Sequence, residues 1–295
     1  MNINDLIQKL DKKSNNSIRK IKIPTKDDII QMLYAEEKIR FSPEYIKLCD
    51  DAANEVNGWL RISKEFQYKI VSDYGFITDV EKDIAVNHMR RAQYIYPNEP
   101  LFKTIPVYVR NNLAQKGIFK TNDIIPNIKI HNMDLSTLDL YSTFNPDKLN
   151  ILIASSHTWQ PFRANIELIK YFKKSYPNIN IIFIYIREAH AIDIWPIGKS
   201  AGVINYEHQS IKDRSICAKN MINTFGFDIN TYLDNMENQI QNELSAWPFR
   251  YYLIEADHEQ HEQHNQHIDI KYKFKYISTP SDSEYDLSEL IQILA

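Results

Sequence analysis

Side chains that could do chemistry follow an apolar run in the middle of the chain. The run "LNILIA" leads into "SSHTWQPF", residues 155–162, which places His157 and Trp159 in a polar turn before a helix that contains Pro161. Ligands bind at the carboxyl ends of the strands in open α/β sheets, so a site is expected at this turn. An imidazole there can move protons or bind a metal, and an indole can stack on a ring. No thiol is present in the turn.

A second group of such side chains follows the next apolar run, "NINIIFIYIRE". Glu188 and His190 stand at its end, and His208 lies further along the connecting segment. A histidine with a pKa near neutrality can shuttle protons or hold a phenol, and a neighbouring carboxylate can orient it. The alternative is that Glu188 caps a helix or forms an ion pair and that His190 is an ordinary loop histidine.

These side chains also suggest a metal site. Two imidazoles and a carboxylate with open positions form the ligand set of non-haem iron and of some zinc or copper sites. The sequence therefore gives the hypothesis of a transition metal, Fe, Zn or Cu, bound by His157, Glu188, His190 and His208. No nucleotide cofactor is expected.

The segment "DHEQHEQHNQH" is a second, peripheral candidate for metal binding. It carries a histidine at every third position: His258, His261, His264 and His267. On a helix such neighbours would share a face and could chelate a metal. The segment stands where a turn between two strands is expected, so a solvated low-complexity insertion is the alternative.

The two cysteines give no support for a disulfide framework. Cys49 and Cys217 are far apart and form no CxxC motif, and both are expected to be buried structural thiols. A thiol oxidoreductase that uses Cys217 remains an alternative. Close to it, Asp213 and Arg214 are expected to lie on a helix as an exposed charge pair.

The elements that must position these residues differ between the two parts of the chain. Residues 1–118 carry helical signals, with Thr25 and Thr78 as N-caps and Pro43 at the first position of a helix predicted to end at Gly75. The sequence predicts an α-helical N-terminal region with these boundaries.

The spacing of apolar residues in 119–295 is typical of an α/β domain. Short strands come first, and then a strand, the helix "PFRANIELIKYFKKSYP" and a second strand form a β-α-β unit. The nearly continuous apolar strands predict a central parallel pair. A further helix, two antiparallel strands and a C-terminal helix complete the order of a thioredoxin-like fold with a central mixed sheet. Pro248 stands where that fold has a cis proline, although it could also be a simple turn proline.

Composition narrows the classes of function. The chain has 295 residues, of which 43% are hydrophobic and 25% charged, and a formal net charge of −3. These values are typical of a globular protein and give no indication of a nucleic-acid or membrane partner. The N-terminus lacks the apolar segment of a signal peptide, so a cytoplasmic location is expected. The oligomeric state is not determined by the sequence.

Four blocks in order resemble the iodothyronine deiodinase family and its bacterial relatives: "SSHTWQPF", "IYIREAHAIDIWPI", "HQSIKDRSICA" and "LDNMENQIQNELSAWPFRYYLI". In that family the turn after the first core strand carries selenocysteine or, in some relatives, cysteine. The resemblance implies that Trp159 takes this place and that Glu188 and His190 line the active site. An indole cannot form a selenenyl or sulfenyl intermediate. The codons for tryptophan and selenocysteine differ by one base. The alternative is therefore that position 159 is a recoded or misread selenocysteine codon.

Two functions are compatible with these features. One is a deiodinase-like enzyme without its chalcogen nucleophile, in which His157, Trp159, Glu188 and His190 act on a small aromatic or phenolic molecule by redox or metal-assisted chemistry. The other is a non-catalytic protein that uses the same pocket to bind a ligand or partner. The residues expected to contact the small molecule are Trp159, Phe162, Trp195 and Pro248.

Overall fold

The computed structural model describes residues 20–257 and 270–278 and divides the chain into two compact units. The described residues of the first unit are 20–40 and 60–110, and those of the second are 41–59, 111–257 and 270–278. This division differs from the predicted boundary at residue 118, because residues 41–59 are assigned to the second unit. The predicted C-terminal helix falls within residues 279–295 and lies outside the described residues.

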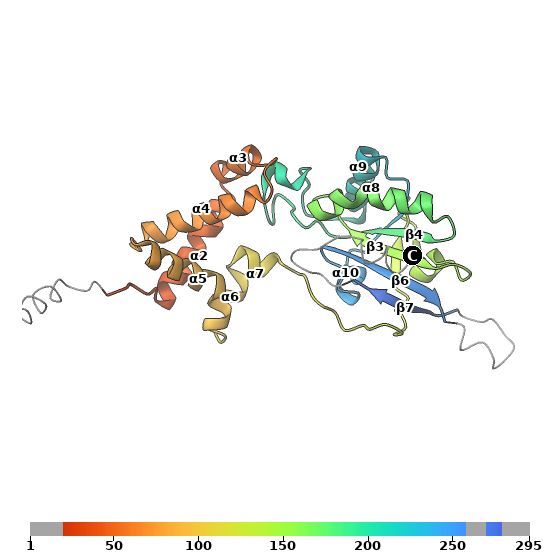
Figure 1. Cartoon of the computed structure of the whole chain (residues 1–295), viewed down its shortest axis with the longest axis horizontal. Helices are drawn as coiled ribbons and strands as arrows, with labels where there is room; N and C mark the ends of the chain where they lie inside the picture. Colours follow the sequence, from red (N-terminus) through yellow and green to blue (C-terminus); the bar gives the residue numbers. More distant parts are fainter. Residues whose placement is uncertain (1–19, 258–269, 279–295) are drawn as a thin grey trace, which may run out of the picture. The chain divides into compact units, whose positions relative to one another are not determined.

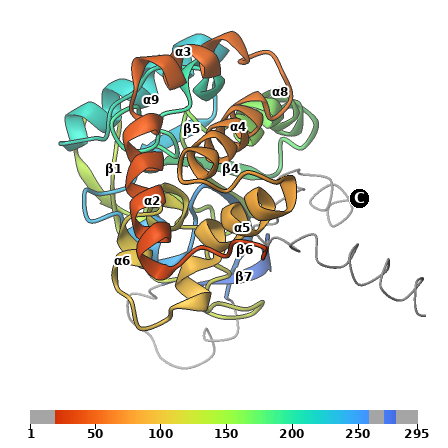
Figure 2. The same cartoon turned by 90° about the vertical axis from the view of Figure 1, so that its left-hand side faces the viewer.

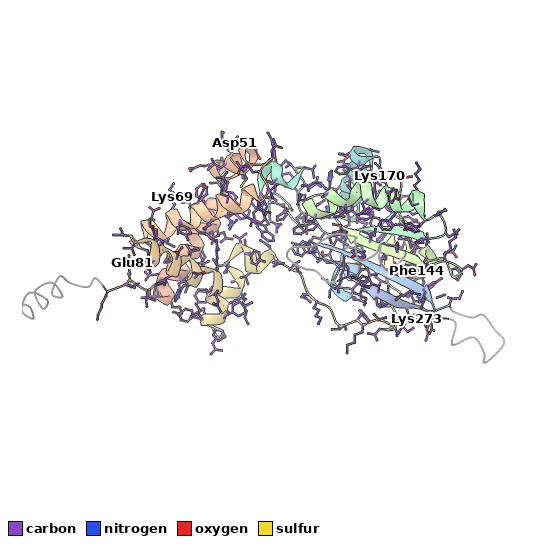
Figure 3. All side chains as sticks on the ribbon, viewed as in Figure 1. Asp51, Lys69, Glu81, Phe144, Lys170 and Lys273 are labelled. Atoms are coloured by element: carbon purple, nitrogen blue, oxygen red, sulfur yellow. The ribbon has the colours of Figure 1, made fainter. Side chains whose placement is uncertain are left out.

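Helices packed around an apolar core form the first unit, in agreement with the helical signals of the sequence (Figure 2). Their bounds are α2 Lys26–Arg40, α4 Gly58–Asp73, α5 Asp79–Ile95, α6 Leu101–Thr104 and α7 Val107–Asn111. The predicted caps are present. Thr25 and Asp28 bond to each other at the start of α2, and Thr78 forms a capping box with Glu81, which Figure 3 labels.

The long helix predicted from Pro43 to Gly75 is wrong in one respect: it is two helices. The first, α3 (Pro43–Asp51), ends before a turn in which Asn57 has a φ of 58°, and α4 begins at Gly58. A side chain at Gly58 would place its Cβ 2.3 Å from the carbonyl oxygen of Ala52. The turn therefore requires glycine at this position.

A seven-stranded mixed sheet forms the second unit (Figure 1). The strand order is β2-β1-β5-β4-β3-β6-β7. The bounds are β1 Lys129–His131, β2 Thr137–Asp139, β3 Asn150–Ser155, β4 Asn180–Tyr185, β5 Asn230–Leu233, β6 Phe249–Ala256 and β7 Tyr272–Ile277. β3, β4 and β5 are parallel neighbours, and β6 and β7 are antiparallel. The predicted central parallel pair and the final hairpin are thus confirmed.

The core of the sheet explains its apolar sequence. Every residue of β3 is buried, as are five of the six residues of β4. Helices α8 (Gln160–Ser175) and α9 (Ile211–Phe225) cover one face, and their apolar side chains pack with those of β3 and β4 (Figure 1). Burial on both faces is the reason that these strands read as continuous apolar runs rather than as alternating ones.

This arrangement is a thioredoxin-like fold, as the sequence predicted. A strand, α8 and a parallel strand are followed by α9, the short α10 (Gln239–Glu243) and an antiparallel hairpin. The Trp247–Pro248 peptide bond, at the start of that hairpin, is cis. The carbonyl of Pro248 accepts a hydrogen bond of 2.9 Å from Ser155 Oγ at the end of β3.

Candidate functional site

The turn between β3 and α8 is fixed by its own polar groups. The backbone N–H of His157 donates to the hydroxyl of Tyr185 over 3.1 Å, and Arg163 donates to the His157 carbonyl over 2.9 Å. Trp159 is the N-cap residue of α8 and supplies no side-chain oxygen to the free N–H groups of the first turn. The turn therefore holds Trp159 at the carboxyl edge of the sheet, where a reactive residue was expected.

Glu188 is the centre of the buried polar network at this edge. Its carboxylate accepts from the N–H and the hydroxyl of Thr158, at 3.1 and 2.7 Å, from Asn205 Nδ2 at 2.8 Å, and from the hydroxyl of Tyr185. His208 Nε2 lies 3.6 Å from the carboxylate, which is longer than a hydrogen bond. Burial alone would raise the pKa of Glu188, but His208 and the two hydroxyls outweigh it and lower the pKa to about 2. The carboxylate is thus ionised and fully hydrogen-bonded.

Arg214 determines which proton His208 carries. Its Nε–H donates to His208 Nδ1 over 3.2 Å, and its other N–H groups donate to the carbonyls of Asp234 and Asn235 and to Asn238 Oδ1. A guanidinium can only donate, so a neutral His208 must carry its proton on Nε2, the nitrogen that faces Glu188. The interpretation of Arg214 as an exposed charge is wrong, because it is 1% exposed. Burial is also the main reason that its pKa is lowered.

His190 lies among all four tryptophans of the chain. The indole of Trp159 is stacked on its ring, with a centroid distance of 5.8 Å and an angle of 16°, and Trp59 and Trp195 contact it at 5.6 and 4.8 Å. Trp247 packs on Trp159 at 6.3 Å. His190 Nδ1 is buried and makes no hydrogen bond. Burial lowers the pKa of His190 to about 3, so the imidazole is neutral and presents no charge to a ligand.

His157 does not join His190 and Glu188 in one cluster. Its ring packs edge-on against Phe225 of α9, with a centroid distance of 5.3 Å, and its Nδ1 is buried without a hydrogen bond. Burial lowers its pKa below the ordinary value. The turn therefore directs the imidazole of His157 toward α9 and the indole of Trp159 toward His190.

The predicted set of metal ligands is not assembled. Within the described part of the chain, a group of three potential ligands within 4.8 Å of one another is formed by Glu188, His208 and Cys217; His157 and His190 are not members of it. These three groups do not suit a metal ion. The donor from Arg214 keeps a proton on His208 Nε2, and the carboxylate of Glu188 is occupied by donors. Burial, followed by the charge of Glu188, raises the pKa of the Cys217 thiol to about 12 when no metal is bound.

The histidine-rich segment cannot be compared with its prediction. His258, His261, His264 and His267 lie outside the described residues.

One of the residues predicted to bind substrate, Phe162, lies in the core instead. Phe162 is completely buried in the core, where it packs against Phe183 with a centroid distance of 4.9 Å. Pro248 contributes its carbonyl to Ser155, as described above. Trp159 and Trp195 do contact His190.

Sequence reasoning missed several members of the site. Thr158 stands between His157 and Trp159, and Tyr185 is the last residue of the apolar strand β4, so the positions of their hydroxyls were a usable signal. The sequence around Asn205 gave no such signal. Trp59 is more than a hundred positions from His190, and no local sequence pattern connects the two residues. Long-range contacts of this kind are set by packing.

A small cavity borders this site in the described part of the chain. The cavity that borders Glu188 and Trp247 has a volume of about 10 Å³, which is room for about one water molecule. A larger one, of about 680 Å³, is lined elsewhere in the unit by residues that include Tyr141 and Tyr272. It contains none of the predicted site residues.

The strand order, the β3–α8 turn and the cis proline facing it define a thioredoxin-fold protein. Residues 104–266, more than half of the chain, match the family model described as iodothyronine deiodinase. The chain belongs to the iodothyronine deiodinase family, as the sequence blocks indicated.

Similar solved structures include thioredoxin-like proteins from three bacteria. An uncharacterized thioredoxin-like protein from Porphyromonas gingivalis shares 14% identity over 59% of this chain and 92% of its own, with a TM-score of 0.38. A putative protein disulfide isomerase from Bacteroides thetaiotaomicron shares 16% over 61% and 91%, with a TM-score of 0.38. A peroxiredoxin-like protein from Aquifex aeolicus shares 11% over 60% and 86%, with a TM-score of 0.39.

Within the described residues, no helix has both the length and the apolar character needed to cross a membrane.

Proposed function

We propose that this protein is a ligand-binding member of the deiodinase family that does not carry out chalcogen chemistry and that holds a small planar aromatic molecule at His190. The observation that carries the proposal is the stacking of Trp159, which stands in the position of the family's reactive residue, on the imidazole of His190. An indole cannot be the nucleophile of a reductive deiodination. It can form one wall of an aromatic site.

Cys217 does not supply a replacement for the missing chalcogen. With a pKa of about 12, about one thiol in 10⁵ is ionised at pH 7, and the thiolate is the reactive form. The charges of Glu188 and Asp213 raise the pKa of Cys217, and the positive charge of Arg214 does not outweigh them, whereas reactive cysteines have predominantly positive surroundings. Both observations favour binding over a thiol mechanism at this site.

The chemistry of His190 defines the ligand that fits. Its ring is neutral, its Nδ1 makes no hydrogen bond, and flat indole surfaces surround it. A neutral aromatic molecule with one O–H or N–H donor would fill this acceptor and pack against the surrounding indoles. An anion would meet no positive charge on the imidazole.

A binding experiment with two matched probes tests the proposal. Three of the four tryptophans contact His190 and the fourth, Trp247, packs on Trp159, so quenching of intrinsic fluorescence reports on this site. We expect 4-iodophenol to bind roughly fivefold more tightly than iodobenzene, because one net hydrogen bond is worth about 1 kcal/mol. In His190→Phe, which keeps a ring but loses the acceptor, the two probes should bind equally. Equal binding of both probes to the wild-type protein would contradict the proposed ligand class.

Iodide release separates a binding protein from an enzyme. With dithiothreitol as reductant, the wild-type protein should release no iodide from 4-iodophenol above the protein-free blank. Trp159→Cys restores a thiol at the turn and should release iodide, with Trp159→Ser as the matched control that lacks sulfur. Catalytic iodide release by the wild-type protein would refute the non-catalytic function.

A further inference from the structure

One of the indoles that contact His190, that of Trp59, comes from a part of the chain outside the residues that match the family model. Trp59 contacts both His190, with a centroid distance of 5.6 Å, and Trp195, at 6.2 Å and an angle of 88°. It belongs to residues 41–59, which form part of the second unit although their sequence precedes the rest of that unit by more than fifty residues. The family model matches residues 104–266.

We propose that residues 41–59 are a built-in cover of the His190 site, in which Trp59 decides which ligands reach the imidazole. The name cover segment is used below for these residues. Trp59 and Trp159 contact the same ring, the first edge-on at 61° and the second stacked at 16°. Trp159 is part of the β3–α8 turn, whereas Trp59 belongs to the cover segment, so Trp59 can be replaced without changing that turn.

The cover segment is attached to the unit by a specific contact. One carboxylate oxygen of Asp50, near the end of α3, accepts a hydrogen bond of 2.6 Å from the backbone N–H of Lys199. The hydroxyl of Ser200 donates to the carbonyl of Cys49 over 3.5 Å. Cys49 is completely buried. These contacts join α3 to the short helix η2 (Gly198–Ala201), in the segment that follows His190 and Trp195.

Gly198 makes this attachment possible. It has a φ of 56°, and a Cβ at this position would lie 2.3 Å from Asp50 Oδ1 and 2.9 Å from the carbonyl oxygen of Ile46. Any side chain here would push α3 away, because real Cβ atoms do not approach backbone so closely. Gly226 has nearly the same φ, 54°, and nothing lies within 4 Å of its Cβ position. The two glycines therefore share the same conformational strain and differ in the contact with the cover segment.

Chemical modification of His190 tests the proposal without any ligand. Diethyl pyrocarbonate reacts with accessible neutral imidazoles, and peptide mass spectrometry gives the rate at each histidine, with the half-buried His131 as internal reference. We expect Trp59→Ala to raise the rate at His190 roughly tenfold relative to wild type. Trp59→Phe, which keeps a ring over the imidazole, should keep the rate close to wild type.

Substitutions of Gly198 and Gly226 test whether the contact between α3 and η2 keeps the cover segment in place. Gly198→Ala should raise the rate at His190, whereas Gly226→Ala should leave it unchanged, although both substitutions strain the backbone equally. If Trp59→Ala leaves His190 as protected as in the wild type, or, where this variant does not fold, if Gly198→Ala behaves like Gly226→Ala, the cover is refuted. If Trp59→Ala exposes His190 and Gly198→Ala does not, the attachment through Asp50 is refuted. Because no ligand is used, failure of the proposed aromatic binding would not change these outcomes.

Discussion

Replacing Glu188 by glutamine should destabilise the protein by about 3–5 kcal/mol, the usual cost of removing one member of a buried ionic network. The carboxylate accepts from Thr158, Tyr185 and Asn205 and faces the protonated Nε2 of His208. An amide would present an N–H₂ group to at least one of these donors, so it would lose an acceptor and add a repulsive contact. The same magnitude follows from the ionisation: a pKa of about 2 instead of 4.5 corresponds to about 3 kcal/mol at neutral pH.

The stabilisation by Glu188 should decrease in acid. The folded state lowers the pKa of Glu188, so its contribution is complete above the unfolded value of 4.5 and is lost as the pH falls toward 2. About 2 kcal/mol of the difference between wild type and Glu188→Gln should disappear between pH 5 and pH 3. Urea unfolding followed by circular dichroism at several pH values measures it.

A matched control separates the network from carboxylates in general. Glu207 lies in the same segment and pairs with Arg187 over 2.7 Å, where both side chains are partly exposed, 17% and 27%. Glu207→Gln should therefore change the free energy of unfolding by no more than about 1 kcal/mol. A Glu188→Gln variant that is within about 1 kcal/mol of wild type at pH 7, or whose deficit does not shrink in acid, would refute the reasoning.

Two further predictions concern residues whose roles the structure redefines. Phe162→Ala should lower the free energy of unfolding by about 3–5 kcal/mol in urea titrations while the dissociation constant of 4-iodophenol stays unchanged, because Phe162 is a core residue. Tyr171→Ala, an exposed position on the same helix, should cost no more than about 0.5 kcal/mol, and a selective loss of ligand binding in Phe162→Ala would overturn the assignment. In a Cys49→Ser background, Cys217 should react with iodoacetamide roughly 50-fold more slowly than an ordinary cysteine. Its pKa of about 12 rather than 9 lowers the thiolate fraction about a thousandfold, and the more basic thiolate is about 20-fold more nucleophilic. Labelling at the rate of a free peptide cysteine, followed by mass spectrometry, would show that the thiol is activated.

Local signals in the sequence were sufficient for most elements of the fold. The cap at Thr78 and the apolar runs of β3 and β4 were read correctly, since capping and burial on both faces leave direct marks on neighbouring residues. The helix break near Gly58 was missed because a glycine and an asparagine within a helical pattern are tolerated as often as they are turns. The contact that requires glycine there, with the carbonyl of Ala52, is invisible in the sequence.

The sequence predicted where the candidate site lies but not which side chains form it. The carboxyl edge of the sheet was identified from the order of strands and polar residues, and Glu188 and His190 do lie there. The proposed partnership of His157 with them failed, because adjacent residues of a tight turn point in different directions. The ring of His157 faces Phe225, whereas the indole of Trp159, two positions further along the chain, faces His190.

The sequence by itself determined the secondary structure, the thioredoxin-like order of elements and the absence of a thiol from the turn. These features follow from residues that are neighbours along the chain, where periodicity and side-chain chemistry act directly. The tertiary structure alone decided that Arg214 fixes the proton of His208 and that Trp59 covers His190. Such pairings depend on the packing of distant segments in three dimensions, and no local energy term records them.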